Sequence, residues 1–117
     1  MKLQFQTRVV EDVTVLECLG RITYRLEAAA LEEKMADLAH DNRQFVIDLS
    51  RVEMIDSAGL GELVHSLVSV RSRQGSIKLA SPSPRIRSLF SLTNLSAVLE
   101  IYPSLEDALL AYRAQAA

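Results

Sequence analysis

Residues 3–9 alternate between apolar and polar side chains, a period of two that predicts a half-buried β-strand. Leu3, Phe5 and Val9 belong to the apolar set. A short turn at Glu11-Asp12 leads into a second apolar segment, residues 13–19. The short connection favours an antiparallel hairpin whose second strand ends at Gly20.

The segment 45–64 changes its hydrophobic period part of the way along. It opens with the apolar run 45–47, which is typical of a buried strand, and continues through a polar stretch to Asp56-Ser57. Beyond it, apolar residues recur at intervals of three and four, as on one face of a helix: Leu60, Leu63, Val64, Leu67 and Val68. We therefore expect Ser57 at the N-terminus of a helix, with Asp56 or Ser57 as the N-cap.

The remaining segments continue an alternation of helices and strands. We expect a helix that Thr23 caps and that runs to about His40, and a C-cap glycine at Gly75. We also expect strands at 77–80 and 98–102, and helices beginning at Ser83-Pro84 and Ser104. The last residues, 114–117, are expected to fray. This alternation predicts an α/β fold, a single domain over residues 1–117. Its mixed sheet has about five strands, the first hairpin antiparallel and the rest parallel, with about four helices.

The central segment resembles a known motif. Asp48-Leu49-Ser50, the apolar Val52 and Ile55, and then Asp56-Ser57-Ala58-Gly59-Leu60-Gly61 are similar to the centre of the STAS domain. That family includes anti-sigma factor antagonists and the cytoplasmic tails of sulfate transporters. The resemblance covers nearly the whole chain. In the antagonist branch a partner kinase phosphorylates the serine that matches Ser57.

Two interpretations of Ser57 follow from its position. Serine is a preferred N-cap, so Ser57 could serve only to begin the helix. Alternatively, it accepts a phosphate, which the free N–H groups and the dipole of a helix N-terminus tolerate. The resemblance favours phosphorylation at Ser57, with Asp56, Asp48 and Gly59 supporting the loop. Gly59 and Gly61 also leave the first turn open to close approach.

A docking surface for a protein partner is expected on the exposed side of the central helix. Its predicted members are Ser57, Gly61, Glu62, His65, Ser66 and Ser69. Basic residues in the later half of the chain are either a solvated face or a patch for an acidic partner: Arg71, Arg73, Lys78, Arg85 and Arg87.

Enzymatic and cofactor functions are not expected. A catalytic serine needs a base within reach, and the only histidines, His40 and His65, are expected on the surface. No cluster of Cys, His or carboxylate residues has the spacing of metal ligands. The segment that contains Gly59 and Gly61 lacks the lysine of a nucleotide-binding loop. We expect no metal and no cofactor.

Composition limits the classes of partner and the cellular compartment that we expect. The net charge of -2 argues against direct nucleic-acid binding. We expect no signal peptide and no membrane insertion, because no apolar run approaches spanning length. The single Cys18 cannot form an internal disulfide, which indicates a reducing, cytoplasmic location.

These observations lead to one hypothesis and one alternative. The hypothesis is an anti-sigma factor antagonist that binds an anti-sigma factor serine kinase when unmodified and releases it when Ser57 is phosphorylated. A separate phosphatase, of the PP2C type, would reset it. The alternative is a constitutive STAS scaffold subunit of a lipid-transport or stress-signalling complex, in which Ser57 is only a cap.

Overall fold

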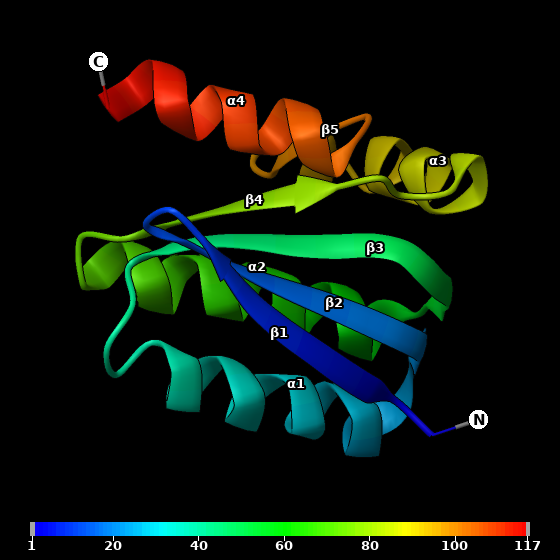
Figure 1. Ribbon diagram of the computed structural model, residues 1–117. Helices are drawn as coiled ribbons and strands as arrows, with labels where there is room; N and C mark the ends of the chain where they lie inside the picture. Colours follow the sequence, from blue (N-terminus) through cyan, green and yellow to red (C-terminus); the bar gives the residue numbers. More distant parts are fainter. Residues whose placement is uncertain (1, 117) are drawn as a thin grey trace.

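The computed structural model describes residues 2–116, which form a five-stranded sheet covered by helices on both faces (Figure 1). The strands are β1 (Gln4–Val10), β2 (Val13–Ile22), β3 (Gln44–Ile55), β4 (Ser76–Ala80) and β5 (Glu100–Tyr102). The helices are α1 (Tyr24–Leu38), α2 (Ser57–Ser72), α3 (Pro84–Leu92), a 3-10 turn η1 (Leu95–Ala97) and α4 (Leu105–Ala116).

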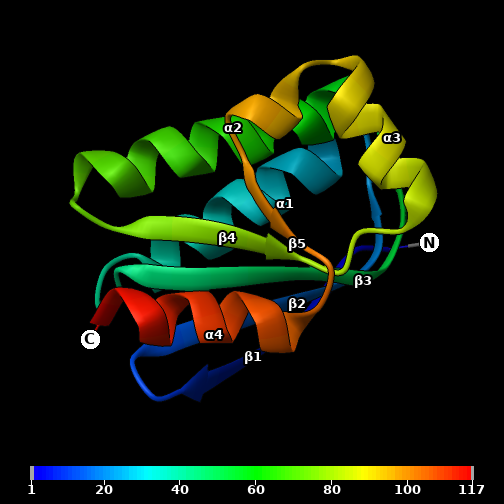
Figure 2. The same cartoon turned by 90° about the horizontal axis from the view of Figure 1, so that it is seen from above.

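The sheet order is β1-β2-β3-β4-β5, with β1 antiparallel to β2 and every later pair parallel. This confirms the predicted α/β fold with an opening hairpin. Parallel neighbours require crossover connections, and α1, α2 and α3 supply them on one face of the sheet. Helix α4 covers the other face, as the view along the sheet shows (Figure 2).

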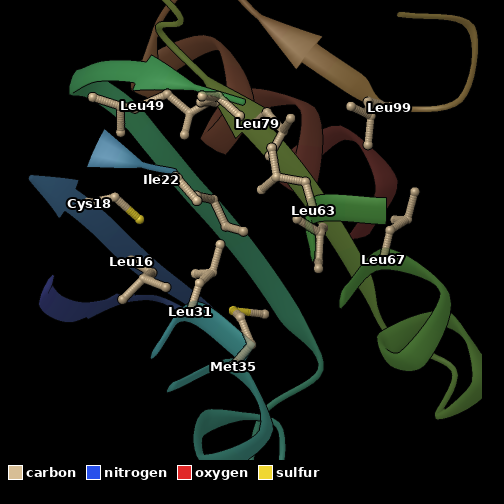
Figure 3. Packing of buried hydrophobic residues seen from close by; sticks show 14 of the residues in the cluster. Leu16, Cys18, Ile22, Leu31, Met35, Leu49, Leu63, Leu67, Leu79 and Leu99 are labelled. Carbon is tan, nitrogen blue, oxygen red and sulfur yellow. The ribbon is translucent and has the colours of Figure 1, made fainter. Parts of the chain in front are cut away.

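The core has two parts because β3 is buried on both sides. Its alternate residues Phe45, Ile47 and Leu49 face α1 and α2 in the larger cluster, while Val46 faces α4 in the smaller one. Figure 3 shows the larger cluster, where Leu31 and Met35 of α1 meet side chains of the sheet. A strand covered on both faces needs a continuous apolar run, which is the pattern that predicted it.

Two predicted helix starts are confirmed by their capping bonds. The Ser83 hydroxyl accepts a hydrogen bond from the Ile86 N–H at 3.2 Å, and Pro84 occupies the first helical position. The Ser104 hydroxyl accepts from the Asp107 N–H at 3.0 Å.

Neither of the two glycines expected to end elements does so. Gly20 lies inside β2, which continues to Ile22, and adopts a φ of 117°. At the end of α2, Gln74 takes the left-handed conformation with a φ of 65°, and the Gly75 N–H donates to the Val70 carbonyl at 2.9 Å. Gly75 is required for space instead, because a Cβ there would lie 2.4 Å from the Arg43 carbonyl oxygen.

Two boundaries and the burial of one strand also differ from expectation. The predicted strand at 98–102 is shortened to β5, because the N–H groups of Val98 and Leu99 donate to the Leu95 carbonyl at the end of η1. Helix α4 continues to Ala116, so residues 114–116 are helical, and Ala117 lies outside the described residues. In β1, Leu3 and Phe5 are covered but Val9 is 63% exposed. The second half of this edge strand is therefore not buried on the side where the alternation predicted burial.

Candidate functional site

The candidate site lies where β2 and β3 end and α2 begins. One carboxylate connects these elements. Asp56 is the N-cap of α2, and its Oδ1 accepts the Gly59 N–H at 3.0 Å. Its Oδ2 accepts the Tyr24 N–H at 2.9 Å. Asp56 therefore joins the N-termini of α1 and α2.

Asp56 stays ionised because its hydrogen bonds favour the charged form. The Tyr24 N–H is the main cause that lowers the pKa of Asp56, and the Gly59 N–H adds to it. The positive end of the α2 dipole acts in the same direction. A negative charge is thus held beside Ser57 at neutral pH.

Gly59 allows α2 to pack directly on the end of β2. A Cβ at this position would lie 2.1 Å from the Ile22 carbonyl oxygen and 2.9 Å from the Ile55 Cγ2. The close approach is therefore made by the chain itself, not by a ligand. Gly61 differs, because a Cβ there would meet nothing within 4 Å. Gly61 leaves an open surface beside Ser57.

Ser57 is the first residue of α2 and is exposed to solvent. The N-cap is Asp56, so the structure assigns helix capping to the carboxylate. The backbone N–H groups of this turn are not all free, however. The Asp56 carboxylate already accepts the Gly59 N–H. The helix dipole, more than direct N–H contacts, would therefore favour a phosphate here.

Tyr24 belongs to the same site but was not predicted from the sequence. Its φ of 60° lies in the left-handed region, which a bulky residue rarely adopts, and the bond to Asp56 holds it there. The residue is 72% exposed, and Leu26 in the same first turn of α1 is 78% exposed. No pattern in the sequence marks a tyrosine for positive φ. The Thr23 hydroxyl, expected to cap α1, instead donates to the Glu27 carboxylate at 3.0 Å.

The predicted docking face of α2 is only partly exposed. Gly61, His65 and Ser69 are open to solvent. Glu62 and Ser66 are only 8% and 3% exposed, so their predicted place on the exposed side was wrong. The two helices α1 and α2 pack side by side, and these two residues lie in the seam between them.

A small polar network fills this seam. The Ser66 hydroxyl donates to Glu62 Oε2 at 2.7 Å, and His65 Nε2 lies 3.1 Å from Glu32 Oε2 of α1. Burial raises the pKa of Glu62, and the Glu32 carboxylate adds to the effect. The hydrogen bond from Ser66 and the charge of His65 oppose the shift. The exposed His65–Glu32 pair connects α2 to α1, whereas the buried Glu62–Ser66 bond lies within α2.

Asp48 lies away from the site and supports its own strand. A register shift between β2 and β3 near Cys18 interrupts the ladder there, and Asp48 Oδ1 accepts the Ser50 N–H at 3.0 Å. The side chain lines a hollow on the α4 face of the sheet, together with Glu17 and Leu105. These contacts do not involve the Ser57 loop, which Asp48 was predicted to hold.

No group of three or more potential metal ligands occurs in residues 2–116. Cys18 is buried, and burial raises the pKa of its thiol to about 12, so the reactive thiolate is scarce. In the same part of the chain, no helix combines the length and apolar character needed to cross a membrane.

Comparison with known proteins identifies the family. The STAS domain model matches residues 4–108, so the chain belongs to the STAS domain family. A Thermotoga neapolitana protein, described as a candidate anti-sigma factor antagonist, is 35% identical over 108 residues, covering 90% of this chain and 94% of the relative. The anti-sigma-B factor antagonist of Bacillus subtilis is 36% identical over 74 residues, 63% of this chain and 68% of the relative.

The fold comparison agrees with the sequence comparison. The crystal structure of an anti-sigma factor antagonist from Mycobacterium paratuberculosis superposes with a TM-score of 0.86 at 28% identity, covering 96% of this chain and 95% of that one. These relatives are named as regulators rather than as enzymes.

Proposed function

We propose that this protein is an anti-sigma factor antagonist that switches partners through phosphorylation of Ser57. Unmodified, it binds an anti-sigma factor that is also a serine kinase, and phosphorylated it releases that kinase. A separate phosphatase of the PP2C type restores the unmodified form. The protein acts in the cytoplasm as a substrate of these enzymes.

The observation that carries the proposal is the position of Ser57. Its hydroxyl is exposed at the first turn of α2, beside a carboxylate that already caps the helix. Because Asp56 performs the capping, Ser57 is free for another role. The open backbone at Gly61 and the exposed Tyr24 surround it with surface on which a kinase could dock.

Electrostatics explain how one phosphate could reverse binding without refolding. Phosphorylation adds about -1.5 to -2 charges at neutral pH. The positive end of the α2 dipole stabilises this charge within the fold. The ionised Asp56 lies next to it, so a partner surface suited to a neutral hydroxyl would meet two neighbouring anions. We expect the main effect on the partner contact, with little change in the domain.

The docking surface that we propose is centred on Ser57 and comprises Tyr24, Ser57, Gly61, His65 and Ser69, all of them exposed. Glu62 and Ser66 shape it from beneath. The relatives named above are antagonists, so the comparisons do not favour the constitutive scaffold.

Phosphosite mapping of the protein from its native host, in growth and under stress, tests the modification. We expect phosphate on Ser57 whose occupancy changes between conditions. The absence of phosphate from an abundant protein under every condition would contradict the proposal.

Binding of the partner tests the switch. With the kinase-type anti-sigma factor of the same host, we expect Ser57→Ala to bind like the wild type. Ser57→Asp should bind at least tenfold more weakly, a difference of ~1.4 kcal/mol. Ser88→Asp is the matched control, because it adds the same charge to an exposed serine of α3, outside the proposed docking surface. Equal affinities of Ser57→Asp and the wild type would show that charge at Ser57 does not operate the switch.

A further inference from the structure

The two edges of the sheet are unequally protected. Strand β5 forms one edge with only three residues and is followed by Pro103. Strand β1 forms the other with seven residues, of which five are exposed. Short strands and prolines guard natural sheet edges against pairing, but long edge strands are templates for it. In Figure 2, β1 is the outermost element at the lower border of the molecule, with no element beyond it.

The hairpin determines which groups of β1 face outward. The turn Glu11-Asp12 contains two residues and is flanked by the pair Val10 and Val13. A turn of this kind is closed by a hydrogen bond between its flanking residues, so the groups of Val10 point to β2. Because hydrogen-bonding direction alternates along a strand, the N–H and C=O groups of Phe5, Thr7 and Val9 point away from the sheet.

The same face of the edge carries an unfilled apolar surface. Val9 is 63% exposed, although its alternation places it on the side of the sheet that α1 covers. Phe5, on that side, lines a shallow hollow of about 590 Å³ between β1 and α1. Ala30 and Ala36 line the hollow too, together with the polar side chains of Glu33, Lys34, Asp37 and His40.

We propose that β1 pairs with β1 of a second copy of this chain, antiparallel and centred on Thr7. In this two-fold register Val9 of one copy lies opposite Phe5 of the other, on the same face, at the edge of the hollow. Directly opposite side chains in such a pair are about 4.5–5.5 Å apart at Cβ. Two copies would form one continuous sheet, and the two Val9 side chains would be covered.

Charge favours this register. It brings Lys2 of each copy to Asp12 of the other, and neither residue forms an ion pair within residues 2–116. The Arg8 side chain lies opposite the uncharged Gln6. A register centred on Arg8 would place two arginines opposite each other, which is unfavourable. A register centred on Gln6 would oppose Val9 to Leu3, which is already buried in its own copy.

Sedimentation equilibrium of the full chain over micromolar to millimolar concentrations tests the proposal. We expect a reversible dimer. Thr7→Pro removes an outward N–H, and proline is tolerated in an edge strand at such a position, so the monomer should keep its fold. We expect this variant to raise the dimer dissociation constant at least tenfold, ~1.4 kcal/mol.

A second variant and a control make the result independent of the proline. Val9→Lys should also weaken the dimer, because it places a charge at the apolar contact. Val98→Lys is the matched control, since Val98 is an exposed valine outside β1. It should leave the dissociation constant unchanged. A dimer that persists in both Thr7→Pro and Val9→Lys would overturn the proposal.

Amide exchange locates the contact residue by residue. As concentration rises, we expect slower exchange at the amides of Phe5, Thr7 and Val9, while those of Gln6 and Arg8, already bonded to β2, stay unchanged. A wild type that remains monomeric, whether its edge is bare or is covered by another protein's strand, overturns the proposal.

Discussion

The Asp56 side chain caps α2 and also binds the first residue of α1, whereas Ser57 has no such structural role. The Asp56 carboxylate accepts N–H groups from the first turn of α2 and from Tyr24, whereas Ser57 is exposed beside it. Neighbouring residues in one motif thus divide the work. The carboxylate maintains the turn, and the hydroxyl is available for chemistry.

This division predicts different costs for substitutions at the two positions. Asp56→Ala removes a helix cap, worth about 0.5–2 kcal/mol, and also leaves the Tyr24 N–H without its acceptor. We expect a loss of about 2 kcal/mol in the free energy of unfolding, measured by urea denaturation. Ser57→Ala, at an exposed position, should change it by less than about 0.5 kcal/mol.

Ser83→Ala is the matched control, because Ser83 caps only α3. It should cost about 1 kcal/mol, as a single cap does. If Asp56→Ala were no more destabilising than Ser83→Ala, the second bond of Asp56 would contribute nothing.

At the scale of elements, a carboxylate is buried between α1 and α2. Glu62 of α2 lies in the seam and accepts a hydrogen bond from Ser66 of the same helix. Because burial raises its pKa, the folded state favours the protonated form. The stability that Glu62 provides is therefore complete below its unfolded pKa and is lost as the pH rises through its folded pKa.

Glu62→Gln imitates the protonated side chain and keeps an oxygen for Ser66. We expect it to be more stable than the wild type at neutral pH. The difference should shrink below the ordinary glutamate pKa of about 4.3, where the wild type is protonated in both states. Urea denaturation at the two pH values measures this. Glu33→Gln, exposed on α1, should show no such pH dependence, and a wild type more stable than Glu62→Gln at neutral pH would refute the argument.

At the scale of the molecule, Tyr112 connects the two layers of the fold. Its hydroxyl lies 2.8 Å from the Phe45 carbonyl oxygen and 3.0 Å from that of Ser76, so α4 is tied to both β3 and β4. Lys78, on the same face, is fully buried. Its ammonium group pairs with Glu100 at 3.1 Å and lies 4.6 Å from the centre of the Tyr112 ring. Lys78 therefore belongs neither to a solvated face nor to a patch for a partner.

Tyr112→Phe keeps the ring and removes the hydroxyl. Loss of a buried hydrogen-bond partner costs about 1–3 kcal/mol, and we expect a decrease of that size in the free energy of unfolding. Tyr102→Phe is the control, since Tyr102 is half-buried and contacts Lys78 through its ring. It should cost less than about 0.5 kcal/mol. Equal effects of the two substitutions would mean that the Tyr112 hydroxyl does not hold α4 to the sheet.

Much of this architecture could be predicted from local patterns. The change of period between residues 45 and 64 located β3 and α2, and Ser83-Pro84 and Ser104 marked two helix starts. These signals succeed because they arise from the geometry of a strand, a helix or a turn. The position of Ser57 at a helix N-terminus followed from the same reasoning.

What the sequence could not predict depends on which elements become neighbours. The packing of α1 against α2 buried Glu62 and Ser66, which an isolated helix would expose. Close packing of α2 on the end of β2 requires a glycine at position 59. The packing of α4 and β5 buries Lys78. Periodicity assigns a residue to a face of its own element, but only tertiary structure determines what covers that face. By itself, therefore, the sequence determined the α/β order and the exposed serine, while the packing of helices on the sheet decided which polar residues surround it.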